Sequence, residues 1–484
     1  MDEQFKLNSR KFYQRELPPV RLCWGSLEAR GSIESMNSST AQILLKAQDG
    51  CINKADIGTL QLGIRGSTHQ PAAMRVVDVD QIIRGGSKFQ LVSVVFTEVQ
   101  ESTFDAEDAI LFGAFVVPFR YQPSWYADFP FLYSYKLVGD VEAVGAYSMV
   151  LSTSLSNNVL IPGFRMRLQV DLKHLNSYTV EGYINDIIID HELSCMHLTF
   201  IYDRPYYEFL RSASEYILCF SPSATPAQLR GAHMPVDGYD CAIKVSYADT
   251  LEEFTEVLRL RHNVSLYEER IDPDTSPDDM EDDFDQHSRQ IILRVGERVA
   301  ACGRVLFVEQ DMQRSEISRF AQIPDKFFRE GFYEVGHLNV DPEYRGGDLY
   351  MNLMNHTSRI GAENGIRYAF AAARAFLMPT YKKLGAYDTG LTAETPVYPG
   401  ERLHVIYFDH RKIEKNTKGS FFAWARTFSS FVEYGLRMGY IKWSLLTAIK
   451  LPLARLAVRC MHGHRRRKWS KEWHRHRDGN KGQE

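Results

Sequence analysis

The chain has 484 residues, of which 44% are apolar and 24% charged, and its formal net charge is −4. This length corresponds to about two to three domains, and the apolar content excludes a disordered chain. The slightly acidic balance argues against a protein that coats nucleic acid, so no nucleic-acid partner is expected. Seven cysteines without a CxxC pair favour reduced thiols over a disulfide framework or a zinc knuckle. The absence of a signal core and of a run of about 18 apolar residues predicts a cytoplasmic, bacterial-style protein without a membrane span.

Residues 1–235 are predicted to be rich in β-strands. Short alternating or β-branched segments recur there, separated by turn residues such as Gly85-Gly86, as in a chain of antiparallel strands. We divide this half into two modules, 1–120 and 121–235, and the Pro-, Gly- and Ser-containing stretch Ser221–Asp240 predicts a linker. The predicted strands include Ala41–Leu45, Gln90–Glu98, Met149–Ser154, Met166–Val170, Val180–Ile189 and Met196–Tyr202.

Residues 245–412 are predicted to form a mixed α/β domain. Thr250 and Glu253 are spaced as a capping box and predict the start of a helix, and Gly296-Glu297 predicts a hairpin between Gln290–Val295 and Arg298–Phe307. The later elements are a strand at Gly331–Val340, a helix at Leu349–Gly361, a strand at Arg367–Ala373 and a short helix at Pro379–Leu384. This order predicts an α/β sheet, and the whole chain is expected to be an α+β multidomain protein.

Residues 418–484 differ in composition from the rest. Phe421–Met438 predicts an amphipathic helix, and the final residues are strongly basic with two tryptophans. Two interpretations are open: a helix packed on the last domain with a solvated tail, or a surface helix whose basic end binds anionic lipid or an acidic protein. The second predicts peripheral contact with the inner membrane.

The segment after the Gly331–Val340 strand predicts an anion site. A turn leads into a predicted helix at about Gly346, and free amides at a helix start bind anions. The segment resembles the V-x-P-x-x-R-G-x-G-x-G loop of GNAT-type acetyltransferases, through Val340, Pro342, Arg345 and Gly346, with Gly347 beside them. The later YKKLGAY, which begins with Tyr381, resembles that family's second motif. The resemblance implies that the loop binds the phosphopantetheine arm of an acyl donor.

Two positions depart from that loop. Asp348 and Tyr350 stand where the family has its second and third glycines. A carboxylate at a helix start opposes a diphosphate, so the expected donor is an acyl carrier protein thioester rather than acyl-coenzyme A. No metal-ligand spacing stands out, and no metal is expected.

A series of upstream motifs resembles the acyl-homoserine lactone synthases and, more closely, the N-acyl amino acid synthases. The matching residues are Arg261, Asp282, Asp285, Arg304, Glu316 and Arg319. The resemblance extends over about residues 245–410. It implies transfer of a fatty acyl group from acyl carrier protein to the amine of an amino acid, and it implies that Asp282 and Asp285 hold the acceptor pocket together.

The proposed reaction needs a deprotonated amine, a polarised carbonyl and a bound substrate carboxylate. Glu334 is the first candidate to take the proton, and Tyr381 to protonate the leaving thiolate. A backbone amide between Gly336 and Leu338 is placed to polarise the thioester, and Arg304 or Arg319 to bind the carboxylate. Structural roles remain open for each side chain: pairing with an arginine for Glu334, packing for Tyr381, and an ion pair with Glu316 for Arg319. Asp282 and Asp285 could likewise belong to a solvated acidic loop.

A short motif near the N-terminus resembles PilZ domains, which are small β-barrels that bind cyclic dimeric GMP. Arg10 and Arg15 are followed by Asn37 and Ser39, but these arginines are one residue too far apart and Gln42 replaces a glycine. Residues 154–156 give a fainter second match. The resemblance implies two PilZ-like barrels, with a barrel that has lost the nucleotide as the alternative.

Together these patterns predict an N-acyltransferase preceded by regulatory barrels. Its expected partners are an acyl carrier protein, a small amine or amino acid and, through the barrels, cyclic dimeric GMP. Two alternatives remain open: a signalling adaptor that responds to cyclic dimeric GMP and has an inactive transferase domain, and a coenzyme A-dependent N-acetyltransferase.

Overall fold

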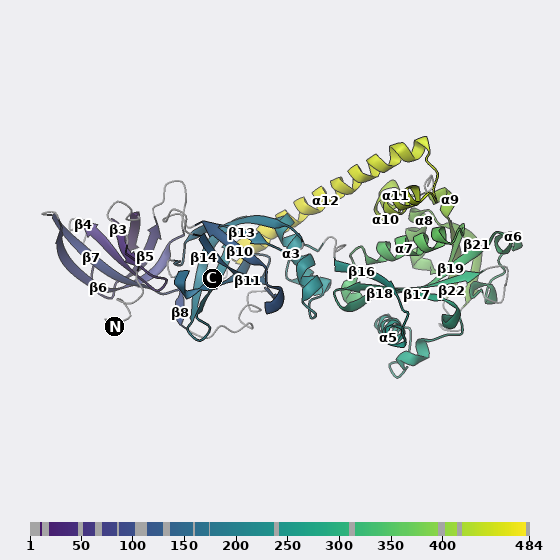
Figure 1. Ribbon diagram of the computed structural model, residues 1–484, viewed down its shortest axis with the longest axis horizontal. Coiled ribbons are helices and arrows are strands. Elements are labelled where there is room, and N and C mark those ends of the chain that lie inside the picture. Colours follow the sequence, from purple (N-terminus) through teal and green to yellow (C-terminus); the bar gives the residue numbers. More distant parts are fainter. Residues whose placement is uncertain are drawn as a thin grey trace. The chain divides into compact units, whose positions relative to one another are not determined.

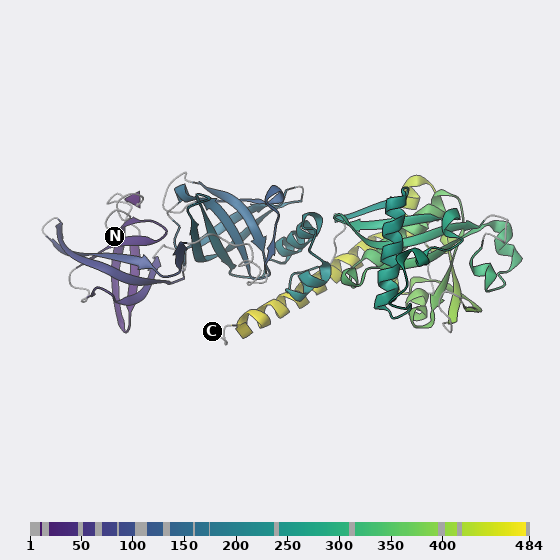
Figure 2. The ribbon, with the colours of Figure 1, turned by 90° about the horizontal axis from the view of Figure 1, so that it is seen from below.

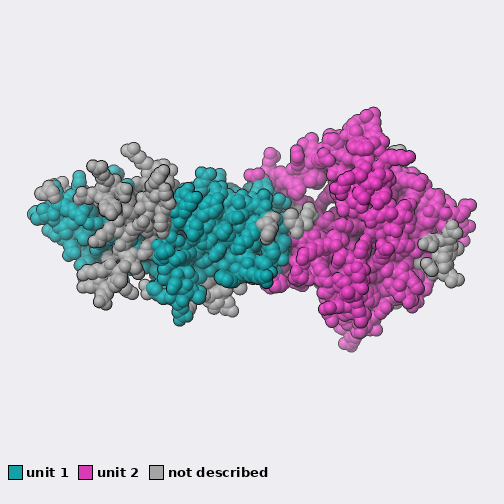
Figure 3. Space-filling view, in the orientation of Figure 1, with its two compact units in different colours: residues 1–221, 232–235, 470–484 teal, residues 222–231, 236–469 magenta. Residues whose placement is uncertain are grey.

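The structure, a computed structural model, describes residues 10–11, 19–46, 52–62, 70–84, 87–101, 114–128, 136–157, 160–173, 175–236, 242–308, 315–394, 402–413 and 419–480. Arg15 and the predicted turn Gly85-Gly86 lie outside these residues. The chain divides into two compact units (Figure 3). The first comprises residues 1–221, 232–235 and 470–484, and the second comprises 222–231 and 236–469.

The first sheet is a closed antiparallel barrel (Figure 1). Among the described residues, its strands pair in the order β1-β3-β2-β5-β6-β7-β4, and the additional pairing of β3 with β4 closes the ring. Burial alternates along β4 as the sequence predicts, with Ala41, Ile43 and Leu45 inside. The strands are β1 (Arg10–Lys11), β2 (Pro19–Trp24), β3 (Leu27–Met36), β4 (Thr40–Lys46), β5 (Ile57–Leu62), β6 (Ala72–Arg84) and β7 (Ser87–Phe96).

The second sheet is also a closed barrel. Its described strands follow the order β10-β13-β14-β15-β12-β11-β9, β8 pairs with β14, and β10 with β11 closes the ring. The prediction of β-barrel modules in the N-terminal half is therefore confirmed as a fold. The strands are β8 (Val99–Glu101), β9 (Phe115–Val116), β10 (Ser124–Asp128), β11 (Lys136–Val144), β12 (Ser148–Ser154), β13 (Arg165–Asp171), β14 (Ser177–Asp190) and β15 (Cys195–Tyr202).

The predicted linker is partly wrong. Helix α4 (Pro226–Gly231) occupies its middle, with Pro226 and Leu229 buried. Proline is well tolerated at the first helical position, and the hydroxyl of Thr225 accepts a hydrogen bond from the amide of Gln228 at 3.3 Å, as an N-cap does. Helix α3 (Tyr207–Phe220), just before this stretch, is a further element that the sequence did not predict.

The third sheet, in the second unit, has the predicted mixed α/β character (Figure 2). Its described strands follow the order β16-β17-β18-β19-β20-β22-β21. β19 and β20 are parallel, connected through α7, and the other neighbours are antiparallel. The strands are β16 (Ile243–Tyr247), β17 (Arg289–Val295), β18 (Arg298–Val308), β19 (Phe332–Val340), β20 (Tyr368–Arg374), β21 (Tyr387–Glu394) and β22 (Arg402–Asp409).

Helices cover both faces of this sheet. Cys302 packs with Val257 and Val264 of α5, whereas a side chain at the next residue, Gly303, would meet Leu353 of α7. Neighbouring strand residues point to opposite faces, so α5 and α7 lie on opposite sides. The predicted capping box opens α5, with Thr250 and Glu253 bonding reciprocally. The helices are α5 (Leu251–Tyr267), α6 (Asp325–Glu330), α7 (Leu349–Glu363), α8 (Met378–Leu384) and α9 (His410–Ile413).

The C-terminal region is helical throughout most of its length. The predicted helix Phe421–Met438 is two helices, α10 (Phe421–Thr427) and α11 (Ser429–Met438), both in contact with α7. The basic end forms the last part of the long helix α12 (Leu445–Asn480). Most of its described side chains are exposed, but Trp473 is buried and donates its indole N–H to the carbonyl of Ala146 at 2.7 Å. No helix among the described residues is long and apolar enough to cross a membrane.

Candidate active site

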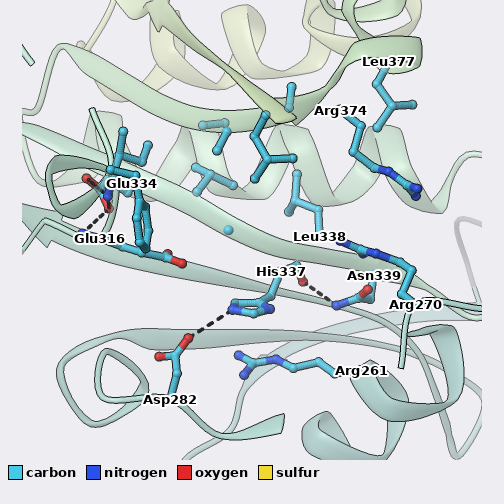
Figure 4. A pocket seen from close by; sticks show the side chains of 18 of the residues that line it. Arg261, Arg270, Asp282, Glu316, Glu334, His337, Leu338, Asn339, Arg374 and Leu377 are labelled. Atoms are coloured by element: carbon cyan, nitrogen blue, oxygen red, sulfur yellow. Dashed lines mark hydrogen bonds and ion pairs between the residues drawn. The ribbon is translucent and has the colours of Figure 1, made fainter. Parts of the chain in front are cut away.

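A pocket of about 220 Å³ opens beside β19 and β20 in the second unit (Figure 4). Its lining combines apolar side chains, among them Leu338, Leu377 and Leu403, with charged and polar ones. Predicted site residues that line it are Arg261, Asp282, Glu316, Glu334 and Tyr381. The pocket therefore brings together groups from α5, the acidic loop, β19 and α8.

The ladder between β18 and β19 is interrupted at the pocket. Arg304 pairs with Gly336 and Cys302 with Asn339, so two residues of β19 lie opposite one residue of β18. One of the two, His337, has a positive φ of 47°. The extra residue of such a bulge is left out of the ladder, and this stretch coincides with the segment predicted to polarise the thioester.

Arg304 is the centre of a buried charge network. It is 1% exposed and forms ion pairs with Asp282, Asp285 and Glu316. Burial by itself lowers the pKa of Arg304, but the three carboxylates outweigh it and raise that pKa. Arg261 is also buried and holds Asp285 through two hydrogen bonds of 2.8 and 2.9 Å. The structure thus gives Arg304 and Arg261 partners within the protein rather than a substrate carboxylate.

Asp282 connects this network to the pocket. Its carboxylate accepts a hydrogen bond from Arg304 and pairs with His337 Nε2 at 3.3 Å. Burial alone would raise the pKa of Asp282, but the bonds from His337 and Arg304 prevail and lower it. Asp282 is therefore ionised and can only accept, which places the imidazole proton on Nε2 and leaves a lone pair on Nδ1. Burial, with a contribution from Arg261, lowers the pKa of His337 and keeps this ring neutral.

Glu334 lies on β19 and is 3% exposed. Both of its oxygens accept hydrogen bonds from one segment: the Ser315 hydroxyl, the Glu316 amide at 2.9 Å and the Ile317 amide at 3.3 Å. Burial raises the pKa of Glu334 from 4.5 to about 7, against the opposing effect of the Ser315 hydrogen bond. Glu334 therefore holds the segment that carries Glu316.

The raised pKa of Glu334 predicts a pH-dependent stability. The Glu334 carboxyl keeps its proton up to about pH 7 in the folded protein and only to about pH 4.5 in the unfolded chain. Its contribution to the unfolding free energy is therefore complete below pH 4.5 and is lost as pH rises through 7. Relative to Glu334→Gln, the wild type should lose on the order of 3 kcal/mol of unfolding free energy between pH 4.5 and 8. Hydrogen exchange of the β19 amides at several pH values measures this difference. Parallel pH profiles of the two proteins would contradict the raised pKa.

Tyr381 is buried on α8 and its hydroxyl accepts a hydrogen bond from Tyr350. Burial raises the pKa of Tyr381, although the bond from Tyr350 acts in the opposite direction. Tyr381 is thus a neutral phenol at the pocket wall. Tyr350, noted in the sequence only as a departure from the glycine-rich loop, is the residue that orients it.

The loop between β19 and α7 differs from the sequence expectation in one respect. α7 begins at Leu349, as the predicted helix Leu349–Gly361 does, and not near Gly346, where the loop resemblance placed the helix start. Gly346 has a φ of +83°, which favours glycine. Asp348 at the helix start forms an ion pair with Arg426 of α10. The negative charge that argued against a coenzyme A diphosphate is therefore matched by a cation from a distant part of the chain.

Several arginines gather around this loop. Glu268 forms ion pairs with Arg345 at 2.7 Å, Arg374 at 3.0 Å and Arg270 at 3.9 Å, so three cations share one carboxylate. Arg230 of α4 donates to the carbonyl of Arg345 at 2.6 Å. Arg270 and Arg374 also line the pocket. This group supplies the positive charge that a phosphate or a carboxylate requires.

Arg319 lies elsewhere. Its side chain is half exposed, pairs with Asp283 at 3.4 Å and lies over the ring of Phe284 at 4.2 Å. It neither lines the pocket nor forms the predicted ion pair with Glu316. Arg304 lies 5.8 Å from the centre of the same Phe284 ring, so Arg319 stays beside the charge network without entering the pocket.

One group in the described residues has the arrangement of metal ligands. Asp282, Glu316 and His337 place one potential ligand atom each within 4.8 Å of the others. Both carboxylates are already ion-paired with buried Arg304, and a divalent cation would have to share them with that guanidinium. The donor set fits an ion-pair network better than a metal.

Of the PilZ-like residues near the N-terminus, Arg10, Asn37 and Ser39 lie in the first barrel. β1 pairs Arg10 with Met36, next to the turn that contains Asn37 and Ser39. Asn37 Oδ1 accepts from the amides of Ser39 at 2.9 Å and Thr40 at 2.7 Å, so this oxygen stabilises the β3–β4 turn. Nucleotide binding by these barrels stays a prediction.

Comparisons with known proteins were made for the whole chain. No family model and no curated protein matches it. Among solved structures it is similar to FeeM, an N-acyl amino acid synthase from uncultured soil microbes, at 10% identity and a TM-score of 0.30, covering 36% of this chain and 94% of that one. The AHL synthase LasI is similar at 14% identity and a TM-score of 0.28, covering 37% of this chain and 95% of that one. A putative N-acetyltransferase from Lactobacillus plantarum is similar at 13% identity and a TM-score of 0.27, covering 35% of this chain and 98% of that one.

Proposed function

We propose that the second unit is an N-acyltransferase that moves an acyl group from a phosphopantetheine thioester to the amine of an amino acid or a similar small amine. The observation that supports this most strongly is the pocket itself. A neutral imidazole, a neutral phenol and a β-bulge border one cavity, next to the arginine-rich loop. The sequence resemblance to N-acyl amino acid synthases points to the same chemistry.

His337 is the proposed acceptor of the amine proton, in place of Glu334. Both Glu334 oxygens are engaged by residues 315–317, whereas the neutral His337 ring has a lone pair on Nδ1 and Asp282 to stabilise the imidazolium that forms. Glu334 then acts as a positioning residue for Glu316.

The proposed reaction balances with these groups. The amine nitrogen attacks the thioester carbonyl, and an amide N–H of the bulge near Leu338 stabilises the oxyanion. The amide bond forms, the C–S bond breaks, His337 takes the amine proton and Tyr381 gives its proton to the thiolate. Arg270 and Arg374 are the pocket-lining cations proposed to bind the substrate carboxylate.

Two compounds are candidates for the acyl donor. An acyl carrier protein is an acidic partner, and the arginines around Glu268 provide complementary charge. Acyl-coenzyme A is the second candidate because Arg426 neutralises Asp348.

Purified full-length protein incubated with each donor and a mixture of amino acids should release free thiol only when an amine is present. We expect at least tenfold higher kcat/KM with the carrier protein, and the reverse order would favour coenzyme A. Folded protein that releases no thiol from either donor would support the adaptor alternative instead.

A further inference from the structure

The first half of α12 exposes an apolar surface. Five leucine and isoleucine side chains there are between 41% and 82% exposed, whereas these residue types are most often buried in folded proteins. We call this surface the α12 stripe, and it comprises Leu445, Leu446, Ile449, Leu453 and Leu456.

The stripe is continuous along the helix. Successive helical residues are about 100° apart, so these five side chains fall within roughly 100° of arc. The opposite side of the helix, with Thr447, Leu451 and Ala454, is buried. Lys450 lies over the ring of Trp424 in α10 at 4.7 Å, and Arg455 pairs with Glu433 in α11 at 2.9 Å. The helix is therefore packed on one side and apolar on its exposed side.

The residues around the stripe are aromatic and basic. Tyr440 and Trp443, just before the helix, are 44% and 69% exposed. Residues 434–470 contain nine Lys and Arg and no Asp or Glu, although the whole chain has a net charge of −4. Positive charge is thus concentrated along the segment that exposes the apolar side chains.

We propose that the α12 stripe binds an anionic lipid bilayer, with the helix lying in the interface between headgroups and acyl chains. An interfacial helix needs an apolar face, aromatic residues at headgroup depth and cations that attract anionic lipid, and this segment provides all three. Acidic side chains of a protein partner would match only the cations, whereas an anionic bilayer matches the cations and also covers the five aliphatic side chains. Attachment of this kind is independent of the proposed acyl transfer.

Vesicle co-sedimentation of the full-length protein tests this inference. Vesicles of phosphatidylcholine with 30% phosphatidylglycerol should bind the wild type at least tenfold more tightly than pure phosphatidylcholine, and 0.5 M salt should weaken that binding. The double variant Ile449→Glu/Leu453→Glu should lose at least tenfold in affinity. Leu251→Glu is the matched control, because Leu251 is 81% exposed at the start of α5, and it should bind as the wild type does.

A second variant protects the test against misfolding. Ile449→Ser/Leu453→Ser removes the apolar contact without adding charge and should also weaken binding, with unchanged unfolding temperature. Wild-type protein that ignores anionic vesicles, or stripe variants that bind them normally, would overturn the inference. So would a dimer in analytical ultracentrifugation that only the stripe variants lose, since a second copy would then cover this face.

Discussion

Arg304→Met should lower the unfolding free energy of the second unit by about 3–5 kcal/mol, because removal of one partner of a buried ion pair leaves the others uncompensated. Asp285 would keep Arg261 and Asp282 would keep His337, but Glu316 would lose its ion pair with Arg304. Hydrogen exchange of the β18 and β19 amides, read by mass spectrometry, measures this sheet separately from the barrels.

Arg319→Met is the matched control for that variant. Arg319 is half exposed, and its ion pair with Asp283 is 3.4 Å long, so its loss should change the unfolding free energy by no more than about 0.5 kcal/mol. Equal destabilisation by the two substitutions would mean that the Arg304 network does not have the stabilising role derived from its burial.

His337→Asn should reduce kcat by roughly 10²–10⁴-fold, the range typical of a lost general base. Asparagine tolerates the positive φ at this position better than most residues do, so the bulge should persist. The wild type should also lose activity on the acid side as the imidazole becomes protonated, and the variant should lack this acid limb. Measurement of kcat against pH for both proteins tests the role of His337.

Two controls accompany His337→Asn. His287→Asn changes an exposed histidine of the acidic loop that does not line the pocket, and it should retain full activity. Glu334→Gln should retain the acid limb even if its rate falls, since Glu334 acts through residues 315–317. Loss of that limb in Glu334→Gln and not in His337→Asn would assign the proton to Glu334, as the sequence first indicated.

Much of the fold follows from local patterns in the sequence. The alternation of apolar and polar residues predicted strands of the barrels. The capping box of Thr250 and Glu253 predicted the start of α5, which begins at Leu251. The helix α3 was missed although Leu210, Ala213 and Ile217 recur in it at the three- and four-residue spacing of an amphipathic helix. The helical course of α12 was missed because its last part is polar and rich in arginine, without apolar periodicity.

The site was predictable where its residues belong to motifs. Asp282, Arg304, Glu316 and Glu334 follow one another in recognisable spacings. In the structure Asp282, Glu316 and Glu334 line one pocket, and buried Arg304 pairs with the first two. The sequence could not distinguish buried Arg304 from exposed Arg319, because burial depends on the assembled sheet.

Other contributors could not be found from local signals. Arg230 and Arg426 reach the β19–α7 loop from 115 and 78 residues away, and only the folded chain brings them there. His337 lies within the segment Gly336–Leu338 that the sequence predicted to polarise the thioester, but the bulge that takes this residue out of the strand ladder is seen only in the folded chain.

The reaction that we propose for this protein makes an amide from a thioester and an amine. Mass spectrometry of lipid extracts, from cells that express the wild type and from cells that express His337→Asn, tests it most directly. We expect a new N-acyl amino acid that is present with the wild type and at least a hundredfold weaker with the variant. Folded wild-type protein that yields no new N-acyl lipid, or equal amounts from both proteins, would contradict the account.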